Sequence, residues 1–103
     1  MYLHLPATGG VTLEDAGNFR AFKIVVGSPN VTLETIRSTL AGVASVADRE
    51  TAWVSERALR QWTGYSEDRA WQEALSAMIA KARPHGWIDD TTNTIRAHME
   101  WPP

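Results

Sequence analysis

The sequence contains no cysteine, and this absence excludes disulfide bonds, thiolate metal sites and thiol nucleophiles together. Its three histidines are scattered without the spacing of metal ligands, so we expect no bound metal and no cofactor. No apolar run reaches the length of a membrane-spanning helix. Residues 1–6 lack the basic start and the long apolar stretch of a secretory signal. These absences together predict a cytoplasmic protein.

An excess of positive charge is also missing. Residues 1–50 carry four basic and five acidic side chains, residues 51–103 carry six and seven, and the formal net charge is −2. Proteins draw much of their affinity for nucleic acid from Lys and Arg side chains that neutralise phosphates. The charge balance therefore argues against a nucleic-acid-binding module.

Tryptophan is unusually frequent. A chain of 103 residues has the length of one domain with a modest core, and this one contains five tryptophans, all in its second half. Tryptophan is favoured both in cores and at binding surfaces. We expect most of them to be buried, and an exposed one would mark a binding surface. The five are Trp53, Trp62, Trp71, Trp87 and Trp101.

The first half of the chain predicts strands followed by a helix. Residues 2–5 and 11–13 flank a Pro-Gly turn segment and predict either a short hairpin or a loose arm. Residues 19–26 are β-branched and aromatic and predict a strand. Apolar side chains recur at helical spacing over residues 33–47, so we expect a helix there. A strand over residues 19–26 with an unpaired edge would favour a homodimer.

The second half predicts two more helices. Residues 52–54 are a short apolar segment, and Ser55 can cap a helix that ends at Gly64. Ser66 can cap a longer helix over residues 67–82, which has a clear apolar face.

The last segment, residues 87–101, predicts a β-hairpin. Its turn-rich tip lies at residues 90–93, and this register places Ile88 opposite Ile95 and Trp87 opposite Arg96. Strand periodicity then divides the return strand into an apolar face and a polar face. The polar face consists of Arg96, His98 and Glu100.

This order of elements resembles the winged helix-turn-helix superfamily. The resemblance is carried by Trp53-Val-Ser-Glu-Arg-Ala-Leu-Arg-Gln-Trp-Thr-Gly64, by the following helix around Trp71, and by Gly86-Trp-Ile and the hairpin. It implies an α+β fold with three helices, a C-terminal β-hairpin and an N-terminal strand. The expected organisation is an N-terminal arm or short hairpin over residues 1–18, and one winged-helix-like domain over residues 19–103.

Most winged helices of this kind bind DNA with the third helix in the major groove. Here the N-terminal half of that helix carries Glu67, Asp68 and Glu73, and the wing tip carries Asp89 and Asp90. Acids at these two places would repel phosphate. A DNA-binding regulator therefore remains only an alternative. It would use Arg57, Arg60, Arg69, Lys81 and Arg83.

The leading interpretation is a small non-enzymatic module that binds another protein. Its expected surface is aromatic and polar and lies around Trp62 and the hairpin, at Trp87, Arg96, His98 and Glu100. The first alternative is the DNA-binding regulator. A second alternative is a small enzyme or accessory subunit that uses the last three of these residues. We expect His85 to serve only the helix end, and residues 27–30 form a weak candidate for an anion-binding turn.

Overall fold

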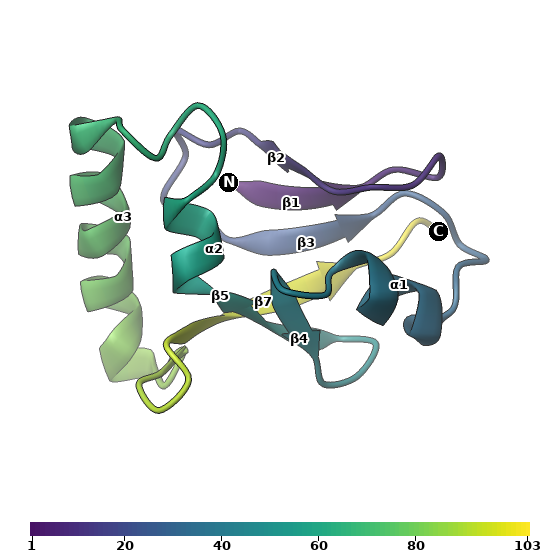
Figure 1. Ribbon diagram of the computed structural model, residues 1–103. Helices are drawn as coiled ribbons and strands as arrows, with labels where there is room; N and C mark the ends of the chain where they lie inside the picture. Colours follow the sequence, from purple (N-terminus) through teal and green to yellow (C-terminus); the bar gives the residue numbers. More distant parts are fainter.

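A computed structural model describes all residues, 1–103, as a curled, mixed β-sheet that carries two short helices and one long one (Figure 1). The sheet contains seven strands and resembles half of a barrel. The strands are β1 (Tyr2–Leu5), β2 (Thr12–Glu14), β3 (Lys23–Val26), β4 (Ala44–Val46), β5 (Thr51–Ser55), β6 (Ile88–Asp89) and β7 (Thr94–Glu100). The helices are α1 (Leu33–Thr39), α2 (Glu56–Arg60), α3 (Arg69–Ala82) and the 3-10 turn η1 (Arg83–His85). None of these helices is both long and apolar enough to cross a membrane.

The strand order is β2-β1-β3-β7-β5-β4, and β6 pairs with the first residues of β7. The central strands β1, β3 and β7 are parallel, whereas the remaining neighbours are antiparallel. Strand β7 lies between β3 and β5, so the last strand of the chain occupies the middle of the sheet. Because Leu3 pairs with Ile24 and Ile24 pairs with Met99, one register places three buried side chains in a row across the sheet.

The sheet has one buried face, which follows from the alternation of apolar and polar residues along each strand. In β7 every second residue is buried and the residues between them are exposed. Helices α1 and α2 cover the buried face (Figure 1). Ile36 and Leu40 at α1, and Leu59 of α2, join the same apolar cluster.

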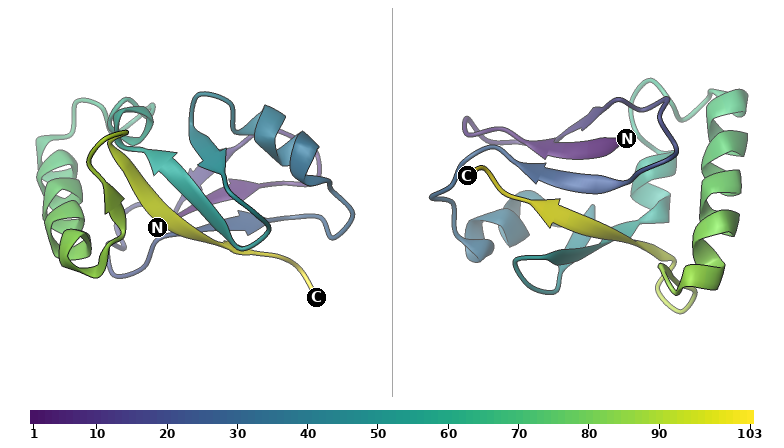
Figure 2. Two further views of the ribbon diagram at one scale, coloured as in Figure 1. Left: turned by 90° about the horizontal axis from the view of Figure 1, so that it is seen from below. Right: turned by 180° about the vertical axis from the view of Figure 1, so that it is seen from behind.

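The opposite face of the sheet carries no helix, and Figure 2 (right) shows its strands uncovered. We refer to it as the open face. Its side chains are half-buried or exposed and mostly polar, as is usual for a sheet that is packed on one side only. Along β7 the open face carries Arg96, His98 and Glu100, and β5 contributes Trp53 beside Arg96.

Helix α3 stands beside the sheet at the end where β1 and β3 begin (Figures 1 and 2). It is held through Trp71, whose side chain is 6% exposed and whose indole N–H donates to the Ala16 carbonyl at 2.9 Å. The rings of Phe19 and Tyr65 pack against the same indole. Leu75 extends this buried face along the helix. The loop that precedes β3 and the long helix are therefore packed as one body.

The winged-helix prediction is wrong. The structure is a strand-rich curled sheet with one long helix, and it contains neither a helix-turn-helix nor three helices with an appended hairpin. The segment expected to open the winged helix, residues 52–54, is part of β5, which pairs with both β4 and β7. Helix α2 spans only Glu56–Arg60 and packs against the buried face of the sheet. The fold is set by pairings between distant strands, which element order alone does not encode.

The helix expected over residues 33–47 is also wrong in its second half. Helix α1 ends at Thr39, and Gly42 adopts a φ of +82°, a left-handed conformation that reverses the chain. Residues 44–46 then form β4. Apolar residues at positions 43 and 46 fit the helical spacing, but they fit a short strand equally well. The cap expected at Ser66 is replaced by Asp68, which accepts from the Trp71 amide at 3.0 Å.

Several predictions are confirmed. Residues 2–5 and 12–14 pair as an antiparallel hairpin. The C-terminal hairpin pairs Ile88 with Ile95 as expected, and the Arg96 amide donates to the Trp87 carbonyl at 2.8 Å. Ser55 caps α2 by accepting from the Ala58 amide. The strand expected over residues 19–26 is observed only over Lys23–Val26. It is paired on both sides, and the sheet edges are β2 and β4, so it offers no unpaired edge that would favour a homodimer.

Candidate functional site

A cleft of about 680 Å³ lies between the open face of the sheet and the C-terminal part of α3. Four segments surround it: residues 19–22, residues 50–51, the end of α3 with η1 and Trp87, and residues 95–98 of β7. Half of its lining residues are hydrophobic, among them Phe19, Phe22 and Met78. A cleft of this size with an apolar lining and a few polar groups has the usual properties of a ligand or side-chain binding site.

The chain between α3 and β7 builds one wall of this cleft. Pro84 lies within η1, and Gly86 ends it with a φ of +77°, which residues with a side chain adopt only with strain. The Arg83 guanidinium then binds the Asp90 carboxylate at 3.0 and 3.3 Å. This ion pair joins the helix end to the tip of the hairpin. The segment between Arg83 and Asp90, which includes Trp87, is therefore linked at its two ends by this ion pair.

Trp87 and His85 form a stacked aromatic pair on this wall. Their ring centroids are 4.4 Å apart and their planes are inclined by only 19°. Trp87 is 43% exposed and is the one large hydrophobic residue with an exposed side chain. Burying a tryptophan yields a large hydrophobic gain, so an exposed one beside a cleft marks a surface that can bind a partner.

Three cationic side chains line the cleft: Arg20, Lys81 and Arg96. None of them forms an ion pair, and none of their side chains donates a hydrogen bond within the chain. Only one acid, Glu50, lines the same cleft. The whole chain carries ten basic and twelve acidic residues. The cleft thus concentrates unpaired positive charge in a protein that is slightly negative overall.

The floor of the cleft lies on β7. His98 pairs with Thr51 of β5 on one side and with Lys23 of β3 on the other. Lys23 is engaged by Glu100, whose carboxylate lies 2.9 Å from the Lys23 ammonium group. The imidazole of His98 has no hydrogen-bond partner within the chain, so it is free to meet a ligand.

Three groups at the boundaries of the site have shifted pKa values. The hydrogen bond from Arg83 lowers the pKa of the Asp90 carboxyl and raises that of the Arg83 guanidinium. Burial lowers the pKa of the Met1 α-ammonium group. That group donates to the carbonyls of Asn18 and Ala21, at 2.6 and 3.2 Å, and so holds the loop that carries Arg20.

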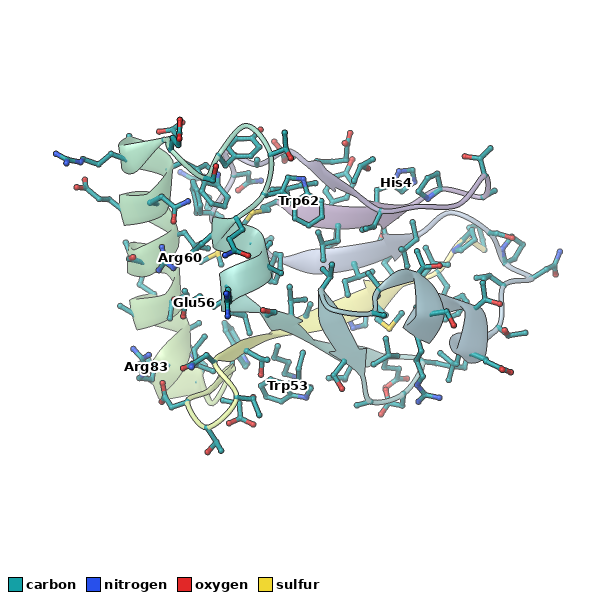
Figure 3. The ribbon with its side chains drawn as sticks, in the orientation of Figure 1. His4, Trp53, Glu56, Arg60, Trp62 and Arg83 are labelled. Atoms are coloured by element: carbon teal, nitrogen blue, oxygen red, sulfur yellow. The ribbon has the colours of Figure 1, made fainter.

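The structure brings together three of the five binding residues expected from the sequence. Trp87, Arg96 and His98 all line the cleft. Glu100 lies farther along the open face and pairs with Lys23. Trp62 packs half-buried against the core near α2, and Figure 3 places it away from Arg83 and the cleft end of α3. Trp87, which the sequence places opposite Arg96, stacks on the imidazole of His85.

Two residues of the DNA-binding alternative are engaged in contacts within the chain. Arg60 points from α2 toward α3 (Figure 3) and contacts Glu56, Gln72 and Ser76 at 2.8 to 2.9 Å. Arg83 is paired with Asp90. Lys81 lines the cleft. The two others, Arg57 and Arg69, are exposed at separate helices. Two of these five cationic side chains, Arg60 and Arg83, are thus occupied by structural contacts.

The candidate residues for catalysis show no paired arrangement. His85 and His98 make no hydrogen bond to a carboxylate or a hydroxyl group, and His4 lies on β1 at the far side of the sheet from α3 (Figure 3). No group of three or more His, Asp or Glu side chains is placed to hold a metal ion. Residues 27–30 lie between β3 and α1 and are not part of the cleft.

The sequence did not identify Arg20, Phe22 or His85 as site residues. Arg20 and Phe22 are separated from β7 by some seventy positions, and only the parallel pairing of β3 with β7 brings them together. The one signal in the sequence was a charged residue, Arg20, between two phenylalanines at positions 19 and 22. We expected His85 only at the helix end, and it does lie there. Its ring also stacks on Trp87 and so forms part of the cleft wall.

No protein-family model matches the chain, and comparisons with curated proteins and with solved structures also return no match. The cleft and its chemistry are therefore the basis for the functional proposal.

Proposed function

We propose that the protein is a non-enzymatic interaction module that binds an acidic segment of a partner protein in the cleft beside α3. The observation that carries this proposal is the unpaired charge of Arg20, Lys81 and Arg96 around one apolar, aromatic-walled cleft. Carboxylates of a partner would give these cations the ion pairs that they lack within the chain.

The electrostatic argument follows from geometry as well as from charge. Three cations that share a cleft repel one another, and this repulsion is a cost to the folded chain that no internal acid relieves except Glu50. Clefts lined by one sign of charge focus the field and accelerate encounter with ligands of the opposite sign. The net charge of −2 leaves the rest of the surface unattractive to the same acidic segment. The acidic segment of a partner should therefore bind at the cleft and not elsewhere on the surface.

The apolar argument rests on Trp87. Tryptophan and arginine are the residue types most often found to dominate binding energy at protein interfaces. Trp87 and Arg96 are joined by a backbone hydrogen bond of 2.8 Å and both line the cleft. A partner that combines acids with an apolar side chain would satisfy both walls at once.

Binding is favoured over covalent catalysis because the cleft lacks a nucleophile that is hydrogen-bonded to a base, the usual way in which a catalytic nucleophile is activated. The DNA-binding alternative is less well supported, since Arg60 and Arg83 are engaged within the chain. Binding to DNA would also require a longer basic surface than the cleft supplies.

The test uses short synthetic peptides labelled with a fluorophore, in which Asp and Glu flank one phenylalanine. The expected result is saturable binding by fluorescence anisotropy that weakens as salt is raised, and no binding of a matched peptide with Lys in place of the acids. The double variant Lys81→Gln/Arg96→Gln should lower affinity at least tenfold, since each charge-assisted contact is worth roughly 1.5 to 3 kcal/mol.

The matched control is Arg57→Gln/Arg69→Gln, which removes the same net charge from exposed positions outside the cleft. This control should leave the affinity almost unchanged. An equal loss in both double variants, or no binding of the acidic peptide to the parent protein, would overturn the proposal. Tighter binding of duplex DNA than of the acidic peptide would favour the regulator instead.

A further inference from the structure

The stacked pair of His85 and Trp87 indicates which apolar group of a partner the cleft selects. The two rings are nearly parallel and 4.4 Å apart, and both line the cleft. The stack buries one ring against the other and still leaves Trp87 43% exposed. The backbone of Trp87 is held on both sides, because its amide donates to the Ala82 carbonyl at 3.4 Å and its carbonyl accepts from the Arg96 amide at 2.8 Å. The exposed indole surface is therefore in place before a ligand arrives.

The cations of the cleft also favour an aromatic group of the partner. Arg20, Lys81 and Arg96 line the cleft without an ion pair, and a guanidinium or ammonium group is attracted to the face of an aromatic ring. Arginine also stacks on flat rings through its planar guanidinium group. An aliphatic side chain would fill the same space but would gain neither the stacking nor the cation–π contact.

We infer that the cleft is specific for an aromatic side chain flanked by carboxylates, with the ring stacked on Trp87 and the carboxylates held by Lys81 and Arg96. This inference rests on the proposed binding of an acidic segment and names the residue type that anchors it. Met78, half-buried beside the same cleft, adds a thioether, which also makes favourable contacts with aromatic rings.

The experiment compares acidic peptides that are identical except at the anchor, which is phenylalanine, cyclohexylalanine or leucine. Cyclohexylalanine has nearly the size and hydrophobicity of phenylalanine but no π-system. Aromatic pairing adds to simple burial, so the phenylalanine peptide should bind about three- to tenfold more tightly than the cyclohexylalanine peptide. On titration, the indole N–H resonance of Trp87 and the ring resonances of His85 should shift most with the phenylalanine peptide.

The variant Trp87→Leu separates the two proposals. It keeps an apolar wall but removes the flat ring, so it should abolish the difference between the phenylalanine and cyclohexylalanine peptides while acidic peptides still bind. Trp53→Leu, a tryptophan of the open face outside the cleft, should preserve the difference. Equal affinity of all three anchors for the parent protein would overturn the aromatic preference and leave acidic binding intact. No binding of any acidic peptide would overturn both.

Discussion

The imidazole of His85 stacks on the indole of Trp87, with centroids 4.4 Å apart and planes inclined by 19°. A proton above the face of an indole is shielded by the ring current, so the ring-proton resonances of His85 should lie upfield of those of an unstacked histidine. Replacing Trp87 with leucine should move them downfield, and NMR spectra of the two proteins measure this. The resonances of His4, on the far side of the sheet, serve as the control. His85 resonances that do not move would show that the two rings are not stacked in solution.

The ion pair between Arg83 and Asp90 predicts a pH dependence. Its hydrogen bond lowers the pKa of the Asp90 carboxyl below the unfolded value. The pair therefore stabilises the fold above the unfolded pKa, and this contribution is lost as pH falls through the folded pKa. Arg83→Gln should raise the pKa of Asp90 toward its ordinary value, as measured by carboxyl-carbon NMR titration. Arg57→Gln, which removes an exposed charge elsewhere, should leave it unchanged.

Arg60 should be a structural residue. Its guanidinium group bridges α2 and α3 through Glu56, Gln72 and Ser76, and only 29% of the side chain is exposed. Arg60→Met should lower the free energy of unfolding by about 1 to 3 kcal/mol, because the partners lose a charged donor. Arg69→Met, at an exposed position at the start of α3, should cost less than about 0.5 kcal/mol. Urea unfolding measures both, and equal costs would contradict the bridging role.

The indole of Trp71 should fix the position of α3. Phenylalanine at this position would keep an aromatic ring, but it would leave the Ala16 carbonyl without its buried donor at 2.9 Å. We expect Trp71→Phe to destabilise the fold by about 1 to 3 kcal/mol. Trp53→Phe is the comparison, because Trp53 is half-buried on the open face and its indole N–H has no partner in the chain. A smaller effect at Trp71 than at Trp53 would disagree with this account.

The charge of the cleft predicts an unusual stability result. Lys81→Gln/Arg96→Gln removes two of the three unpaired cations that line one cleft, so the variant should unfold at the same temperature as the parent protein or slightly higher. Any increase should be larger at low ionic strength, because salt screens the repulsion. Thermal unfolding at two salt concentrations measures this. A marked loss of stability would mean that these side chains support the fold rather than a binding site.

The local features of the fold could be read from the sequence. The C-terminal hairpin, its register at Ile88 and Ile95, and the division of β7 into a buried and an exposed face all follow from turn chemistry and alternation. These interactions join residues that are close in the chain. Trp87, Arg96 and His98 belong to this hairpin, so the sequence alone could predict that they lie close together.

The arrangement of the sheet could not be read in the same way. Lys23 bonds to Glu100 across 77 positions, and nothing near either residue indicates the other. The apolar residues around position 44 fitted a helix as well as a strand, and Gly42 decided between them through its left-handed conformation. The cleft depends on both the distant pairing and the position of α3, which explains why Arg20 and Phe22 were not recognised.

The central place of β7 has a consequence for how the molecule forms. Strands β3 and β5 each pair with β7 on one side, so their backbone pairing cannot be complete until residues 94–100 have left the ribosome. Native topologies dominated by long-range pairing fold slowly, because the closure of long loops precedes the contacts that reward it. During synthesis the nascent chain therefore exposes two unfinished strand edges, and chaperones that shield such edges should influence its yield more than they do for a helical bundle of equal length.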